Sequence, residues 1–172
     1  MITTAGSGPV VMVAVVGAAE TRAAIEWAAD YVASRAGTLL LVGTWRGRVH
    51  YGLPPFTVTY DPEPGARAAL KAAADGVALS PEQIQTELVR GDTGRVLAAR
   101  SRDVDLLVVG REPGSRVLGS LLGWLGDQCV RRAACPVVVV PVDQHANWTA
   151  SVVPVSACER VSPWLRGSFS FS

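Results

Sequence analysis

Short apolar runs alternate with helical hydrophobic patterns along most of the chain. The run Val10–Val16 is continuous and ends at Gly17, which is typical of a strand that is covered on both faces of a sheet. From Thr21 to Ala36 the apolar residues return every three or four positions, which predicts an amphipathic helix with Gly37 as its left-handed cap. The pattern therefore opens with a buried strand followed by a helix.

The same alternation continues as far as residue 141. Four further runs predict strands: Thr38–Trp45, Ile84–Val89, Asp105–Val109 and Val137–Val140. Three further periodic segments predict helices: Ala66–Leu79, Arg95–Arg102 and Leu125–Ala134. Strands that alternate with helices in this way indicate an α/β fold with a parallel sheet and right-handed crossovers. The proline-rich segment Arg46–Gly65 is expected to be the main loop, and Ile84–Val89, with its mixed alternation, suits a sheet edge.

Ligands of open parallel sheets bind at the carboxyl ends of the strands, where the strand order reverses. This rule points to the turns after Val16, Trp45 and Val109. The sequence has no GxxxxGK, GxGxxG or GxSxG motif and no carboxylates spaced for acid/base catalysis, so we predict no catalytic residues and no enzyme. Trp27 and Tyr31, on the first helix, are interpreted as core or interface residues.

Composition limits the partners that the chain can have. Apolar residues make up 49% of the sequence and the formal net charge is +1, which argues against disorder and against a strongly basic nucleic-acid binder. The arginines are scattered along the sequence and are expected to form no patch. The apolar runs are strand-sized, well short of the roughly 20 residues that cross a bilayer. We expect no nucleic-acid partner and no membrane partner.

The cysteines and histidines indicate no metal site. Cys129, Cys135 and Cys158 have neither CxxC nor zinc-ligand spacing, so they are interpreted as small buried hydrophobic residues. Only two histidines are present, which is too few for a metal site built from imidazoles.

The two ends of the chain differ from its middle. Residues 1–9 form a lead in which no basic residue precedes an apolar stretch, so it does not resemble a secretory signal and a cytoplasmic location is expected. Residues 10–141 are expected to form one domain. Residues 142–172 have no sustained hydrophobic period and are expected to form an irregular or disordered tail.

Two blocks in the second half of the chain resemble a known family. Asp105-Leu106-Leu107-Val108-Val109-Gly110 is followed, twenty-five residues after the glycine, by Cys135-Pro136-Val137-Val138-Val139-Val140. With the apolar strand that ends at Gly17 and with Gly91 after the third strand, these blocks resemble the universal stress protein (UspA-like) family. The resemblance covers about Val10–Pro141. It implies an open, Rossmann-like sheet of five parallel strands in the order 3-2-1-4-5, sandwiched by helices, of the nucleotide α-hydrolase type.

The nucleotide-binding members of that family carry Gly, two residues, Gly, nine residues, then Gly and Ser or Thr. Such glycines let the backbone N–H groups face a phosphate at a helix start. Here Gly110 and Gly123 keep two positions, but Pro113 has no N–H to donate and Trp124 has no hydroxyl. Val16 stands where the family has the Asp that binds the nucleoside. The resemblance therefore implies a degenerate site that binds ATP or AMP weakly at best.

Other residues near this loop leave an alternative open. Arg111 and Arg116 supply charge that suits a rearranged phosphate cradle, but a solvated glycine-rich loop with surface arginines is the favoured interpretation. Asp127, in the first turn of the last helix, would repel a nearby phosphate. The residues assigned to the degenerate site are Gly17, Gly110, Gly114, Gly119, Ser120 and Gly123.

The last strand, Val137–Val140, is expected at the edge of the sheet. An open edge of four valines is an aggregation hazard unless it is paired or covered. Members of the family pair this strand across a two-fold axis, so the resemblance implies a homodimer through Val137, Val138, Val139 and Val140. The alternative is that the tail after Val142 folds back over this edge.

Three functions are compatible with these patterns. The first is a stress-response module that acts through dimerisation and contacts with unidentified protein partners, without tight nucleotide binding. The second is an ATP- or AMP-binding regulatory switch of the same fold. The third is an enzyme of a related nucleotide-handling α/β family, for which the sequence offers no catalytic residues.

Overall fold

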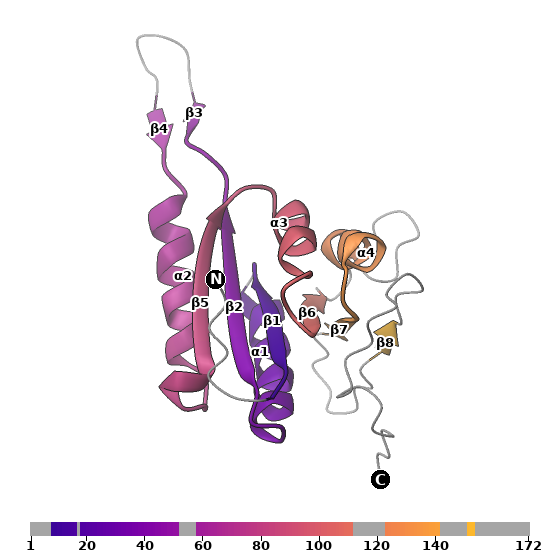
Figure 1. Ribbon diagram of the computed structural model, residues 1–172. Helices are drawn as coiled ribbons and strands as arrows, with labels where there is room; N and C mark the ends of the chain where they lie inside the picture. Colours follow the sequence, from indigo (N-terminus) through magenta and orange to yellow (C-terminus); the bar gives the residue numbers. More distant parts are fainter. Residues whose placement is uncertain (1–7, 17, 52–57, 112–122, 142–150, 154–172) are drawn as a thin grey trace.

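A sheet of parallel strands forms the centre of the molecule, in the order β5-β2-β1-β6-β7 (Figure 1). The computed structural model describes residues 8–16, 18–51, 58–111, 123–141 and 151–153. The five parallel strands are β1 (Val10–Val15), β2 (Thr38–Trp45), β5 (Ile84–Arg90), β6 (Leu106–Arg111) and β7 (Val137–Pro141). When these five strands are numbered along the chain, their order is 3-2-1-4-5, so the predicted topology is confirmed.

Helices cover both faces of this sheet, which gives three layers. The helices are α1 (Ala18–Ala33), α2 (Glu63–Asp75), α3 (Thr93–Arg100) and α4 (Gly123–Arg132), and a single 3-10 turn, Pro81–Gln83, precedes β5. α1 and α2 lie on one face, and α3 and α4 lie on the other (Figure 1). The predicted helices are all present, with boundaries shifted by two to four residues.

The strands alternate their side chains between two separate cores. Val11 and Val13 of β1 pack with Leu39 and Leu41 of β2 against α1 and α2, whereas their neighbours in sequence face α3 and α4. The second core includes Met12, Ala14, Leu40, Val42, Leu97, Leu107 and Cys129. Burying a side chain of this size stabilises the fold by about 1.5–3 kcal/mol. A strand with a core on each face must be apolar throughout, which explains the continuous runs.

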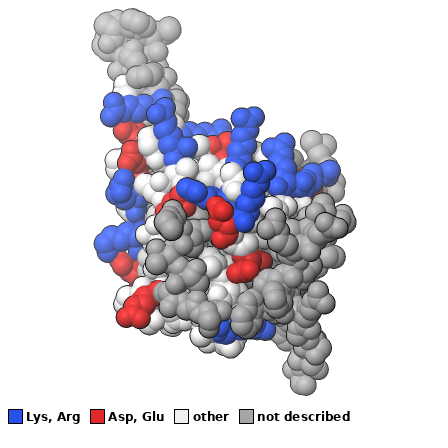
Figure 2. All heavy atoms as spheres, viewed as in Figure 1, with Lys and Arg blue, Asp and Glu red and all other residues white. Residues whose placement is uncertain are grey.

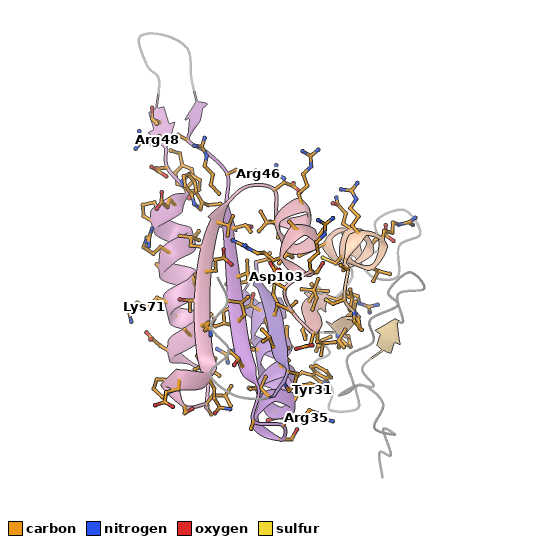
Figure 3. The ribbon with its side chains drawn as sticks, in the orientation of Figure 1. Tyr31, Arg35, Arg46, Arg48, Lys71 and Asp103 are labelled. Carbon is orange, nitrogen blue, oxygen red and sulfur yellow. The ribbon has the colours of Figure 1, made fainter. Side chains whose placement is uncertain are left out.

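Two aromatic side chains on α1 belong to the first core. Trp27 and Tyr31 stack with their ring centroids 5.4 Å apart, and the Arg35 guanidinium lies 4.1 Å from the centre of the Tyr31 ring. Tyr31 is buried, and its burial is the main reason that the pKa of its hydroxyl is raised. Figure 3 places Tyr31 and Arg35 at the end of α1 that is remote from the carboxyl ends of the strands. Tyr31 is a core residue and Trp27, partly buried, packs against this core, so of the two alternatives, core or interface, the described residues support the core.

The predicted main loop, Arg46–Gly65, contains regular structure that the sequence analysis missed. β3 (Val49–Tyr51) and β4 (Val58–Tyr60) pair antiparallel, and this hairpin projects beyond the carboxyl ends of the sheet (Figure 1). α2 then begins at Glu63 rather than at Ala66. Strands of three residues are too short to show an alternating hydrophobic pattern, so the prolines dominated the prediction.

The outer edge of β7 is paired within the chain. β8 (Ser151–Val153) lies antiparallel to β7, and its residues pair with Val137, Val138 and Val139. The sequence analysis gave this arrangement as its alternative to a dimer. The expectation of an irregular tail is therefore wrong for Ser151–Val153, and the rest of 142–172 lies outside the described residues.

The end of α1 differs from its predicted cap. Ala36, not Gly37, has the positive φ of 49°, so the left-handed residue after the helix is an alanine. Gly37 is required for another reason, because a Cβ at this position would lie 2.4 Å from the carbonyl oxygen of Pro9. The chain passes closely from α1 into β2 at this glycine, and Thr38 N–H donates to the same Pro9 oxygen at 2.9 Å.

Substitutions at Ala36 and Gly37 should change stability in opposite directions. Ala36→Gly relieves the strain of a left-handed alanine and should raise the free energy of unfolding by up to about 1 kcal/mol, because the entropy lost by glycine offsets part of the gain. Gly37→Ala should lower the free energy of unfolding, since its Cβ meets the Pro9 carbonyl. Urea unfolding followed by circular dichroism measures both changes. Ala99→Gly, on the exposed face of α3, is the matched control and should lose about 1 kcal/mol. An equal loss in Ala36→Gly and Ala99→Gly would contradict the assignment of strain to Ala36.

Candidate functional site

The carboxyl ends of the five parallel strands form one edge of the sheet, and the candidate site lies there. β1 pairs with β2 on one side and with β6 on the other, so the strand order reverses between β1 and β6. Helices that follow parallel strands begin at the same edge, and their N-terminal ends carry partial positive charge. Open parallel sheets bind ligands at this edge, and the helix ends give it a favourable potential for anions.

Val16, directly after β1, presents an apolar side chain at this edge. The residue is 48% exposed, which is unusual for a large hydrophobic residue among the described parts of the chain. Its backbone N–H donates to the Thr21 hydroxyl at 3.0 Å. Thr21 is itself buried on α1, so the polar group at the end of β1 is already satisfied inside the protein. Val16 offers a ligand neither a side-chain donor nor an acceptor.

The second half of the candidate site follows β6. Gly110 pairs with Val140 and Arg111 pairs with Pro141 in the β6–β7 register, and both Gly110 and Arg111 are half-buried. α4 begins at Gly123, so the predicted residues Gly123 and Trp124 form its first turn. The other predicted positions lie outside the described residues: Gly17, Pro113, Gly114, Arg116, Gly119 and Ser120. The structure therefore brings Val16 and Gly110 to one edge, and the assignment of the full site stays a prediction.

Asp127 on α4 is held by a neighbouring cation. Its carboxylate accepts a hydrogen bond from Arg131 Nε at 2.9 Å, one helical turn away. This hydrogen bond raises the pKa of the Arg131 guanidinium above its ordinary value. The prediction that Asp127 lies in the first turn of this helix is wrong, because α4 begins at Gly123 and its first turn has no acidic residue. Its distance from the helix start and its pairing with Arg131 both reduce the repulsion of a phosphate that the sequence analysis attributed to it.

Arginines gather at the carboxyl edge, contrary to the sequence analysis. Figure 2 shows the blue side chains concentrated toward the end of the molecule where the parallel strands of Figure 1 terminate. We name as the arginine rim the residues that end these strands or closely follow them: Arg46, Arg48, Arg90, Arg95 and Arg111. The expectation that the arginines form no patch is wrong, because the topology brings together residues that are far apart in sequence.

Several contacts fix the arginine rim in place. Arg46 forms an ion pair of 2.7 Å with Asp92, the residue that caps α3, and Arg48 forms one of 2.9 Å with Asp61 (Figure 3). The hydrogen bond from Arg48 is the main cause that lowers the pKa of the Asp61 carboxyl. The Arg90 guanidinium lies 5.4 Å from the Trp45 ring centre, within cation–π range. One signal was present in the sequence, since Arg46, Arg90 and Arg111 each follow a predicted strand directly or by one residue.

The described residues contain little other chemistry. No group of three or more His, Cys, Asp or Glu side chains among them is arranged to hold a metal ion. Cys129 and Cys135 are buried, as expected, and burial raises the pKa of the Cys129 thiol to about 12. Cys158 lies outside the described residues. None of the described helices is long and apolar enough to cross a membrane.

The family assignment rests on comparison of the chain with known proteins. The model of the universal stress protein family matches residues 9–141. The chain belongs to the universal stress protein family. This match covers the five parallel strands and all four helices, and it ends at the last residue of β7.

Relatives in sequence and in structure agree with this family. Universal stress protein Rv2624c of Mycobacterium tuberculosis is 32% identical over 151 residues, which cover 81% of this chain and 54% of that protein. The chain thus spans about half the length of this relative. A universal stress protein crystallised in complex with cAMP superposes with a TM-score of 0.61 at 22% identity, covering 80% of this chain and all of that one.

A second solved structure is a universal stress protein family protein from Arabidopsis thaliana with AMP bound. It superposes with a TM-score of 0.55 at 20% identity and covers 79% of this chain and 93% of that one. At these identities, both structural matches concern the fold of the family. They are consistent with the universal stress protein topology described above for β1, β2, β5, β6 and β7.

Thr21 should be needed to hold the end of β1. Thr21→Val keeps the shape of the side chain but leaves Val16 N–H without its acceptor, which should lower the free energy of unfolding by about 1–3 kcal/mol. Thr21→Ser keeps the hydroxyl and is the matched control. Urea unfolding measures the stability, and amide hydrogen exchange at Val16 reports the bond itself. Equal stability and equal exchange in the two variants would show that this hydrogen bond does not hold β1.

Proposed function

We propose that this universal stress protein is a non-enzymatic stress-response module that acts through protein contacts and binds ATP or AMP weakly at best. The observation that carries the proposal is Val16, which has an exposed apolar side chain at the end of the central strand. Its backbone N–H donates a hydrogen bond to the Thr21 hydroxyl. We expect the protein to work in the cytoplasm. Its protein partners are not identified by the chain itself.

The chemistry of the replaced residues supports weak binding. The solved relatives with cAMP and with AMP indicate that a nucleotide is a ligand in this family. In this chain valine, proline and tryptophan stand at three positions where the family pattern has polar or glycine residues. A lost partner for a buried polar group costs about 1–3 kcal/mol, so several losses lower the affinity by roughly 10²-fold or more.

A nucleotide-binding switch is the second candidate, and the arginine rim favours it. Five arginines at the carboxyl edge attract phosphates, and Arg46 and Arg48 each keep about two-thirds of their side-chain surface exposed, 71% and 68%. Gly110 is also retained at the end of β6. Charge of this kind speeds the encounter with an anion more than it fixes the anion in one pose. The rim by itself therefore supports weak association, and we place the switch second.

Restoring the polar positions should restore binding. The triple variant Val16→Asp, Pro113→Gly, Trp124→Ser returns a nucleoside acceptor, a backbone donor and a hydroxyl, so its affinity for ATP should rise at least about tenfold over the wild type. Isothermal titration calorimetry with ATP and with AMP measures both proteins. Tyr60→Asp adds the same charge at another exposed apolar position, on β4, and should leave the affinity unchanged.

Two results would overturn the proposed function. Micromolar or tighter binding of ATP by the wild type would make the switch the better assignment and would give Arg111 and Arg116 a compensating role. No gain in a folded triple variant would mean that the loop differs from the family pattern by more than these three residues.

A homodimer through Val137, Val138, Val139 and Val140 is part of the proposal. An antiparallel pair of identical strands is self-complementary, which is why this edge suits a two-fold contact. Within one chain, β8 pairs with Val137, Val138 and Val139. We therefore propose that β8 and a second copy of β7 compete for one edge, so the protein is monomeric while β8 is in place. β8 pairs with β7 over only three residues, so replacing β8 by the β7 strand of a second copy breaks few hydrogen bonds.

Weakening β8 should produce the dimer. Val152 pairs with Val138 at the centre of the short ladder, and Val152→Pro disfavours pairing there. Size-exclusion chromatography with light scattering at tens of micromolar should give a monomer for the wild type and a dimer for Val152→Pro. Val152→Thr keeps a β-branched residue and is the matched control, which should stay monomeric. A monomeric Val152→Pro variant would contradict the competition, and a dimeric wild type would show that β8 does not protect the edge.

A further inference from the structure

A pocket of about 550 Å³ lies between α1 and α2, on the face of the sheet that these helices cover. Its volume is within the usual range for small-molecule sites. Val15 at the end of β1 and Ile25 on α1 contribute apolar surface to it, and Val16 lies at its border with the carboxyl edge. The pocket is thus separate from the β6–α4 side, where the family pattern places the phosphates.

Small residues on α2 create this space. The wall on that side consists of Ala69, Ala72, Ala73 and Gly76. A Cβ added at Gly76 would meet only backbone oxygens of α2 itself, the nearest at 3.5 Å, and no atom of α1. Packed helices ordinarily fill such a gap with interdigitating side chains. The four residues of this wall have at most one side-chain carbon each, so α1 and α2 leave an apolar groove between them.

Two opposite charges stand on the α1 side of the pocket. Arg22 and Glu26 are both exposed, lie one turn apart and form no ion pair with each other. No partner for the Arg22 side chain is found among the described residues. Arg22 also lies near the N-terminal end of α1, where the helix dipole favours an anion. Thr21 is buried, so Arg22 is the exposed donor next to the pocket that can bind an acid.

We propose that this pocket binds an amphiphilic monoanion, an apolar chain or ring that carries one carboxylate. The apolar part contacts Val15, Ile25 and the alanines of α2, and the carboxylate accepts hydrogen bonds from the Arg22 guanidinium, whose planar fork matches it. Glu26 repels a ligand with several negative charges, so the pocket selects a single charge and disfavours a nucleoside triphosphate. This ligand is additional to the proposed function and does not depend on it.

Dodecanoate is a suitable probe because it combines one carboxylate with an apolar chain. Isothermal titration calorimetry with the full chain, below the micelle concentration, should show one dodecanoate per protein with micromolar affinity. Ala72→Leu fills the pocket from an exposed position of α2 and should weaken binding at least about tenfold. Ala68→Leu, which is exposed on the same helix but does not line the pocket, should leave it unchanged.

The charge of Arg22 is tested with a second ligand. Arg22→Gln should weaken dodecanoate binding several-fold but leave dodecanol binding unchanged, whereas Arg95→Gln, at the arginine rim, should affect neither. Absence of dodecanoate binding, or equal affinity in Ala72→Leu and Ala68→Leu, would overturn the proposal. Displacement of dodecanoate by pyrophosphate would also overturn it, since phosphates are assigned to the β6–α4 side and only the nucleoside position, Val16, borders the pocket. Tight ATP binding would refute only the proposed function.

Discussion

The burial of β1 on both faces is the constraint on which the rest of the structure depends. β1 pairs with β2 and β6, and its side chains alternate between two closed cores, so every residue from Val10 to Ala14 is buried. A polar side chain would be costly anywhere along this strand. Val16 is the first residue after β1, and its side chain is exposed at the carboxyl edge. The side chain at this position therefore contributes to what the edge can recognise, and here it is apolar.

The fold could be predicted from the sequence because its elements are governed by local patterns. Buried parallel strands are continuous apolar runs, and β2 occupies the very segment, Thr38–Trp45, that its pattern predicted. Two features escaped prediction for physical reasons. The β3–β4 hairpin is too short to show a period, and the left-handed turn at Ala36 was assigned to the glycine beside it. The pairing of β8 with β7 was given only as an alternative, because it depends on a neighbouring strand rather than on a pattern in the tail itself.

The candidate site could be predicted only in part, because its properties depend on which strand ends become neighbours. The position of Val16 followed from the strand pattern and the family resemblance. The arginine rim did not, since Arg46, Arg90 and Arg111 are at least twenty-one residues apart in sequence and come to one edge only in the order β5-β2-β1-β6. The pocket between α1 and α2 was also missed. The alanine-rich sequence of α2 predicts a helix well. It does not show whether side chains of α1 fill the space beside the alanines.

Charge and polarity at the carboxyl edge support different aspects of recognition. The rim holds five arginines in a chain whose formal net charge is +1, and two of them, Arg46 and Arg48, pair with Asp92 and Asp61. An exposed field of this kind draws anions over about a Debye length and weakens as salt is added. Holding one anion in one pose requires buried donors and acceptors, because these are what a wrong ligand leaves unpaired. Val16, with its N–H bound to Thr21, supplies none. Among the described residues, the edge therefore combines a long-range attraction for anions with an apolar side chain at the end of the central strand.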